Sequence, residues 1–204
     1  MKTNILIIRH AQSVANNTGM FGGITDYELS QEGFSQADIL ATRLKDIEVD
    51  KIYSSPLKRA FNTIRPTANM KKIDINIIDG LKEINMGEWE DRLICELKEK
   101  HPKETDYITK TEYYKGIIGQ EETIDVANRM YDNILKVAEE NLDKTIIVTS
   151  HLAAIRAFLC KIMNIPFEET KDKIGNLDNA SITKIIYDNN EKRFFVEYLG
   201  EQVI

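Results

Sequence analysis

Short apolar runs that alternate with amphipathic segments constrain the fold of this chain more than any other feature. Residues 5–8 and 146–148 are wholly apolar, rich in β-branched side chains, and lack the polar alternation of a half-exposed strand. Such runs are typical of strands buried on both faces of a parallel sheet. Because segments with helical spacing lie between them, the sequence predicts an α/β sandwich with a mostly parallel sheet.

Apolar spacing and turn residues predict the remaining elements. Ser30 can cap one helix, and Pro56 favours the first position of another. The stretch 91–120 contains Pro102 and is interpreted as a helix followed by a looser excursion. The predicted segments are helices over 31–47, from 55 onward, over 123–141 and over 152–163, and strands over 51–53, 73–78, 181–187 and 193–198.

Charge and composition argue against several classes of protein. A net charge of −6 and a pI of about 5.2 disfavour nucleic acid or an anionic membrane surface as the main partner. The first apolar run has only four residues, too few for a signal peptide or a membrane span, so a cytoplasmic location is expected. Cys95 and Cys160 are expected to be buried free thiols. With 204 residues and no evident linker, one domain over 1–204 is expected.

Two of the three histidines directly follow apolar strands. Arg9 and His10 come after the first apolar run, and His151 comes after the second. Ligands bind beyond the carboxyl ends of the strands in such sheets. Arg59 lies in the first turn of a predicted helix, where free backbone N–H groups favour an anion. Spacing alone leaves two structural histidines and an exposed arginine as the alternative, and His101 is expected at the surface.

Phosphoryl transfer suits these residue types. Arginine offers a charged, planar fork of donors to phosphoryl oxygens, and neutral imidazole is a good nucleophile. A phosphoramidate at a histidine would divide one difficult displacement into two easier ones. The leaving alkoxide then needs a proton from a carboxylic acid. Spacing alone cannot choose that acid among the 33 Asp and Glu residues.

Six motifs, in order along the chain, match one known family. Arg-His-Ala-Gln-Ser at 9–13, followed by Asn16, is similar to an Arg-His-Gly-Glu-Thr/Ser motif. Together the motifs resemble those of the histidine phosphatase superfamily, in its phosphoglycerate mutase-like branch, over nearly the whole chain. They lie at residues 9–16, 23–37, 53–63, 81–90, 150–151 and 179–181.

The resemblance implies a role for each matching residue. His10 would be the phosphorylated nucleophile, and Arg9, Arg59 and His151 would hold the phosphoryl oxygens. Glu83 would donate a proton to the leaving group and later activate water. The fold would be a three-layer αβα sandwich in which residues 80–122 cover the site, with no metal and no organic cofactor. The implied substrate-binding set is Arg9, Asn16, Gly23, Ile24, Thr25, Arg59, His151 and Leu152.

Three positions depart from the family pattern beside the expected site. Ala11 and Gln12 stand where Gly and Glu are usual, and Leu152 stands where Gly usually follows the second histidine. A methyl group at position 11 fits if the backbone there does not need a positive φ. A side chain at 152 is either tolerated by its loop or reshapes the pocket. Residues 119–122 also differ from the family's common Gly-Glu-Ser.

The expected function is metal-independent hydrolysis of a small phosphorylated metabolite through a phosphohistidine. Two alternatives stay open. The first is a phosphoglycerate mutase, although the shortness of residues 80–122 favours hydrolysis. The second is a phospho-ligand binding module with weak activity, which the departures at 11, 12 and 152 motivate. The sequence does not identify the substrate, and a homodimer is one option for its assembly.

Overall fold

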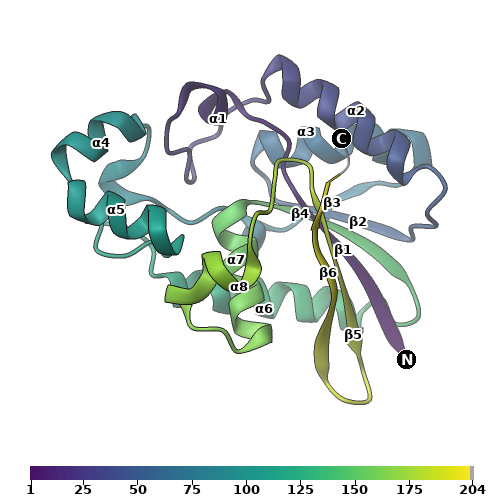
Figure 1. Cartoon of the computed structure of the whole chain (residues 1–204). Coiled ribbons are helices and arrows are strands. Elements are labelled where there is room, and N and C mark those ends of the chain that lie inside the picture. The colour runs from purple at the N-terminus through teal and green to yellow at the C-terminus, as the bar shows by residue number, and fades with distance from the viewer. Residues whose placement is uncertain (203–204) are drawn as a thin grey trace.

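The predicted apolar strands form the centre of a six-stranded sheet in the computed structural model, which describes residues 1–202. The strand order is β3-β2-β4-β1-β5-β6 (Figure 1). The first four strands in this order are parallel, whereas β5 is antiparallel to β1 and to β6. The strands are β1 (Lys2–Arg9), β2 (Lys51–Ser54), β3 (Ile75–Ile77), β4 (Thr145–Ser150), β5 (Ile182–Asp188) and β6 (Arg193–Glu201).

Helices follow most of the strands and cover both faces of the sheet. Figure 1 shows α2 and α3 on one side and α6, α7 and α8 on the other. The helices are α1 (Val14–Thr18), α2 (Gln31–Leu44), α3 (Lys58–Lys71), α4 (Ile94–Lys100), α5 (Pro102–Thr111), α6 (Thr123–Glu139), α7 (Leu152–Met163) and α8 (Thr170–Ile174), with short 3-10 turns at Asp79–Leu81, Gly87–Trp89 and Phe167–Glu169.

Alternate residues of β1 supply the two cores of the sandwich, because successive strand side chains point to opposite faces. Leu6 and Ile8 pack in the cluster that includes Leu40 of α2. Ile5 and Ile7 belong to the cluster that includes Met130 of α6. The predicted αβα sandwich with a mostly parallel sheet is therefore confirmed.

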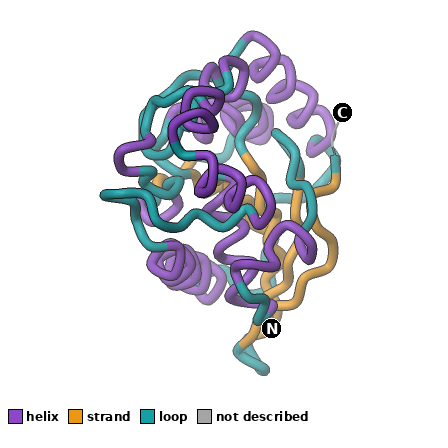
Figure 2. The backbone as a smooth tube through the Cα atoms, turned by 60° about the vertical axis from the view of Figure 1, so that its left-hand side comes forward, coloured by secondary structure: helices purple, strands orange, loops and turns teal. Residues whose placement is uncertain are grey.

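Helices α4 and α5 lie apart from the sheet, on the side where α1 lies (Figure 1). Figure 2 turns this side of the molecule toward the reader. One helix was expected in this stretch, but Pro102 begins a second one, since a proline is well tolerated where the first N–H groups lack partners. The helices α1 and α8 were not predicted, because each has only five residues and no apolar periodicity.

Two further expectations need correction. Helix α3 begins at Lys58 and not at Pro56, because the Ser55 N–H still bonds to Thr149 of the sheet and Leu57 keeps an extended backbone. Cys160 is buried as expected, but Cys95 is exposed, since only Leu97 of its short helix faces the core. Among the described residues, no helix combines the length and apolar character needed to cross a bilayer.

Candidate active site

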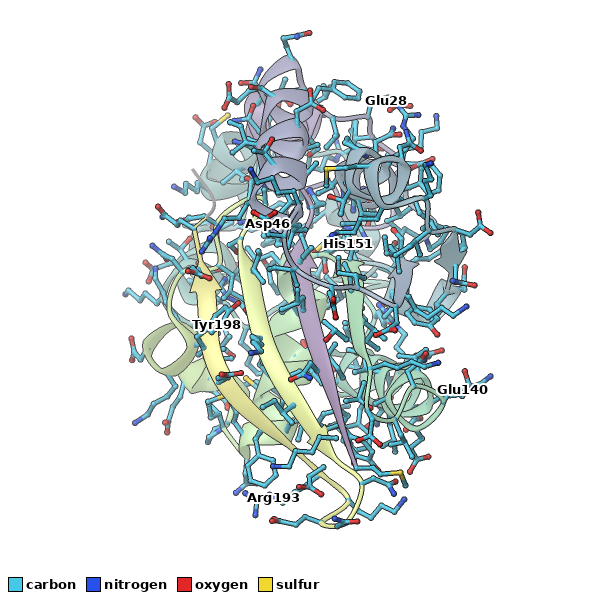
Figure 3. All side chains as sticks on the ribbon, turned by 90° about the vertical axis from the view of Figure 1, so that its right-hand side faces the viewer. Glu28, Asp46, Glu140, His151, Arg193 and Tyr198 are labelled. Atoms are coloured by element: carbon cyan, nitrogen blue, oxygen red, sulfur yellow. The ribbon has the colours of Figure 1, made fainter. Side chains whose placement is uncertain are left out.

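The register of β1 against β4 brings the two histidines together. Arg9 lies opposite Ser150, and the His10 N–H donates to the Ser150 carbonyl at 2.9 Å. The centroids of the His10 and His151 rings are therefore only 5.2 Å apart. In Figure 3, His151 lies near the arrowhead of β1, between the helical layers. The expected convergence at the carboxyl ends of the strands is confirmed for this pair.

A second strand pairing fixes the ring of His151. β2 runs parallel to β4, so Ser55 follows β2 beside His151, and the Ser55 hydroxyl lies 2.8 Å from Nε2 of that ring. The imidazole is completely buried, and its Nδ1 has no hydrogen-bond partner among residues 1–202. One ring nitrogen of His151 is thus held by the protein, whereas the other is buried without a hydrogen-bond partner in this part of the chain.

His10 carries a neutral imidazole with a lone pair on Nε2. Its Nδ1 lies 2.7 Å from the Ala11 carbonyl, which can only accept, so Nδ1 carries the proton and Nε2 keeps a lone pair. Burial lowers the pKa of His10 well below its ordinary value near 6.5, and the nearby charges of Arg59 and Arg9 lower it further. Burial and Arg59 also lower the pKa of His151. Both rings are therefore neutral at neutral pH.

This electrostatic setting predicts an unusual titration of His10. Because the pKa is lowered in the folded protein, the ring should stay neutral at pH 6 and protonate only in more acidic solution. NMR titration of the ring resonances in the unligated protein measures this directly. The denatured protein is the control, in which histidines titrate near about 6.5. Arg59→Gln should move the His10 pKa upward, and a wild-type midpoint at or above 6.5 would contradict the expectation.

Two arginines bring positive charge to the same place. Arg59 is buried and donates from Nη1 to the Thr25 carbonyl at 2.8 Å and from Nη2 to the Gly23 carbonyl at 2.6 Å. Arg9 donates from Nη1 to the Leu177 carbonyl at 2.6 Å. A guanidinium has five N–H donors, so each arginine keeps several for an anion. Burial lowers the pKa of both groups, but arginine stays charged in proteins.

Glu83 faces the arginines from the other helical layer. Its Oε1 accepts from the backbone N–H groups of Ile84 and Ala154, both at 2.9 Å, and its Oε2 accepts from Ala153 at 3.2 Å. Ala153 and Ala154 lie in the first turn of α7, directly after His151. The carboxyl group is therefore fixed at a helix N-terminus beside the two histidines.

The backbone that carries Glu83 is braced by a residue that the sequence did not single out. Arg129 of α6 donates to the carbonyls of Gly80, Lys82 and Glu83 at 2.7–3.0 Å. It also pairs through Nε with Glu121 at 2.7 Å. Nothing in the sequence distinguishes Arg129 from other polar residues of an amphipathic helix, because the three carbonyls that it holds lie more than 40 positions away.

Glu90 fixes the loop that holds Arg59. Its carboxylate accepts from the N–H groups of Ile24 at 3.0 Å, Thr25 at 3.2 Å and Met86 at 2.8 Å. A Cβ at position 23 would lie 1.7 Å from the Glu90 Oε1, so a side chain there would displace this carboxylate from the loop. Since Arg59 is held by the carbonyls of this same loop, Glu90 positions Arg59 without touching it.

We therefore expect Glu90→Ala to weaken phosphate binding. Losing charge-assisted hydrogen bonds, each of about 1.5–3 kcal/mol, should loosen the loop and raise the inhibition constant of inorganic phosphate about 10-fold or more. Competitive inhibition assays measure it. Asp91→Asn is the matched control, since Asp91 bonds the Tyr27 hydroxyl of the same loop but none of its backbone N–H groups. An unchanged inhibition constant in Glu90→Ala would rule out the positioning role.

One cavity of about 190 Å³ collects most of the expected residues. Three of the expected residues lie outside its lining: His151 is buried beside His10, and the N–H groups of Ile24 and Thr25 are engaged by Glu90. Their roles in binding substrate stay predictions. The expected residues that line the cavity are Arg9, His10, Asn16, Gly23, Arg59, Glu83 and Leu152.

The departures from the family pattern have distinct places. Ala11 has no positive φ, and its methyl group is buried in a small cluster that includes Leu29. The Gln12 amide oxygen accepts from the Ser30 hydroxyl at 2.7 Å, and Gln12 does not line the cavity. Leu152, in contrast, does line it. Of the three, only the side chain at 152 changes the shape of the pocket.

The fold and this cluster define a phosphatase that acts on phosphomonoesters. The chain belongs to the histidine phosphatase superfamily (branch 1), whose family model matches residues 5–198. It is 32% identical over 181 residues to phosphoserine phosphatase 1 of Hydrogenobacter thermophilus, covering 89% of this chain and 85% of that one. The adenosylcobalamin/alpha-ribazole phosphatase of Escherichia coli is 25% identical, with 79% and 80% covered. The crystal structure of the Entamoeba histolytica phosphoserine phosphatase with 3-phosphoglyceric acid superposes with a TM-score of 0.84 at 26% identity, over 98% of each chain.

Proposed function

We propose that this phosphatase works through a phosphohistidine at Nε2 of His10. The observation that supports it most is the meeting of His10, Arg9, Arg59 and Glu83 at one small cavity. Two guanidinium groups face a single acidic side chain, so an excess of positive charge remains, which suits a phosphoryl dianion. Because catalysis of phosphoryl transfer consists mostly of positioning and charge neutralisation, these groups suffice for the reaction without a metal ion.

In the first step, Nε2 of His10 attacks phosphorus and the ester P–O bond breaks. The carboxylic acid of Glu83 gives its proton to the departing alkoxide oxygen, so an alcohol leaves. Arg9 and Arg59 hold the equatorial oxygens while charge builds on them. For His151, whose ring centroid lies 5.2 Å from that of His10, the proposal assigns the unpartnered Nδ1 as the atom that would contact one of these oxygens.

In the second step, the Glu83 carboxylate takes a proton from a water molecule. The water oxygen attacks phosphorus, the N–P bond breaks, and inorganic phosphate leaves with neutral His10 restored. Two backbone N–H groups of α7 hold the Glu83 carboxyl group in place. This serves both steps, because the same carboxyl group must face first the leaving oxygen and then the water.

We also propose that residues 80–122 cover this site, within a single domain. Support comes from Met86, Ile94 and Tyr114, which line the cavity, and from the hydrogen bonds of Glu90 to residues 24 and 25. The free thiols of Cys95 and Cys160 are in keeping with a cytoplasmic location.

Hydrolysis of p-nitrophenyl phosphate in the presence of EDTA tests the proposal. Turnover should be undiminished by the chelator, because none of the proposed steps uses a metal ion. Absence of turnover on this ester and on a broad panel of phosphorylated metabolites would overturn the proposal. Activity that EDTA removes and a divalent cation restores would overturn its metal independence.

A further inference from the structure

Large apolar side chains line the cavity beside the residues that we propose to bind the phosphoryl group. Of the described residues that line the cavity, none is Lys or Asp. Its charged members are Arg9, Arg59 and Glu83, which the proposed mechanism assigns to the phosphoryl group and to the leaving oxygen. His10, the polar side chains of Ser13 and Asn16, and three small residues also line it. The large apolar and aromatic side chains of the lining, called the apolar collar below, are those of Met20, Phe21, Met86, Ile94, Tyr114 and Leu152.

The collar is built by backbone pairing between two distant segments. The Phe21 N–H donates to the Arg92 carbonyl at 3.0 Å, and the Ile94 N–H donates to the Gly19 carbonyl at 2.9 Å. A β-bridge joins Met20 to Leu93 between them. These bonds hold the backbone at residues 20, 21 and 94, whose side chains line the cavity.

Aromatic packing supports the collar from behind. The Phe21 ring lies 5.7 Å from the Trp89 ring and 6.3 Å, edge-on, from the Tyr114 ring. Trp89 and Tyr114 are buried. Burial also raises the pKa of Tyr114, so its hydroxyl is a neutral group that can donate a single hydrogen bond. The wall therefore offers apolar surface and a neutral hydroxyl, and no counter-charge.

Leu152 adds an apolar side chain to the cavity that Glu83 also lines. It is the first residue of α7, and the N–H groups of the next two residues hold the Glu83 carboxylate. Because Leu152 and Glu83 line the same cavity, we expect the leaving alcohol of a substrate whose ester oxygen meets Glu83 to lie near Leu152. Leu152, which stands where the family usually has glycine, is therefore part of the surface that we expect to receive the leaving group.

We propose that the leaving group is a small, uncharged alcohol with an apolar body, and not an amino acid or a hydroxy acid. This inference rests on the proposed function. A carboxylate or an ammonium group in the collar would lose its water without gaining a partner of opposite charge, whereas an apolar body gains by leaving water. The cavity, at about 190 Å³, is below the roughly 300–1,000 Å³ of sites for drug-sized ligands, which suits a small alcohol.

Four esters of primary alcohols test the proposal, since all four need a proton on a leaving alkoxide. They are benzyl phosphate, which is uncharged beyond the phosphate, phosphoethanolamine, which adds an ammonium group, 3-phosphoglycerate, which adds a carboxylate, and O-phosphoserine, which adds both. We expect kcat/KM for benzyl phosphate to exceed each of the other values by at least about 10-fold.

Two variants assign that preference to the collar. Ile94→Lys places a cation at a half-buried collar position and should raise kcat/KM for 3-phosphoglycerate relative to benzyl phosphate at least about 10-fold. Ile118→Lys adds the same charge at an exposed residue outside the cavity and should leave the ratio unchanged. Leu152→Gly is the second test, since it should lower the preference for benzyl phosphate by several-fold.

The outcomes separate this inference from the proposed function. A wild-type preference for O-phosphoserine, phosphoethanolamine or 3-phosphoglycerate would overturn the apolar leaving group and leave the phosphohistidine mechanism standing. An unchanged preference in both Ile94→Lys and Leu152→Gly would show that the collar does not select the substrate. Absence of turnover on all four esters and on p-nitrophenyl phosphate would overturn the proposed function itself.

Discussion

Replacing His10 by alanine is expected to lower kcat at least about 10⁴-fold for every phosphomonoester that the enzyme turns over. The variant loses the Nε2 lone pair, and no other imidazole lies in the cavity lining within the described part of the chain. The two arginines remain, so substrate should still bind. Steady-state kinetics on p-nitrophenyl phosphate, with inorganic phosphate as a competing ligand, measure both effects.

His101→Ala is the matched control for this variant. His101 is exposed, and its ring centroid lies 5.6 Å from that of Trp89. It does not line the cavity that contains His10. Its replacement should leave kcat within a few-fold of the wild type. If His10→Ala keeps the fold by circular dichroism and still turns over at a tenth of the wild-type rate or more, His10 is not the nucleophile.

The replacement of Glu83 by glutamine is expected to slow the turnover of alkyl phosphates far more than that of aryl phosphates. An alkyl phosphate releases a basic alkoxide that needs a proton, so its kcat should fall by about 10²–10⁴-fold. An aryl phosphate releases a stable phenolate and should slow far less in the first step. Glutamine has the same size, and its amide oxygen can still accept from Ile84 and Ala154, so the fold should persist.

The comparison is made on benzyl phosphate and p-nitrophenyl phosphate under single-turnover conditions, which isolate transfer to the enzyme from the later hydrolysis. The aryl ester serves as the internal control for binding and folding. Equal slowing of both esters would mean that Glu83 is not the proton donor and acts only on the geometry of the site.

Much of the fold could be predicted because local pattern and burial agree. The β-branched runs that became β1 and β4 are buried on both faces, and α6 and α7 show the apolar spacing of core helices. The start of α3 could not be predicted, since Ser55 is drawn into the sheet and toward His151 by bonds to residues far along the chain.

The site residues that could be predicted are those that a family motif or the order of the strands identifies. Residues that position the site through hydrogen bonds to distant backbone groups could not be predicted. His10 and His151 follow adjacent strands, so their meeting follows from sheet order. Glu83 could be chosen from the family motif alone, because nothing local distinguishes it from other acids. Arg129 and Glu90 act on backbone groups far away in sequence, and no periodicity in the chain reveals such contacts.

The phosphorylated enzyme itself provides the most direct test of the central claim. Rapid quenching during turnover of a ³²P-labelled phosphomonoester, followed by peptide mapping, should find acid-labile, base-stable phosphate on the peptide that contains His10. The label should be absent from His10→Ala and enriched in Glu83→Gln if hydrolysis of the intermediate is slowed. A wild-type enzyme that turns over with no such label, or with stable phosphate on another residue, would contradict the phosphohistidine mechanism.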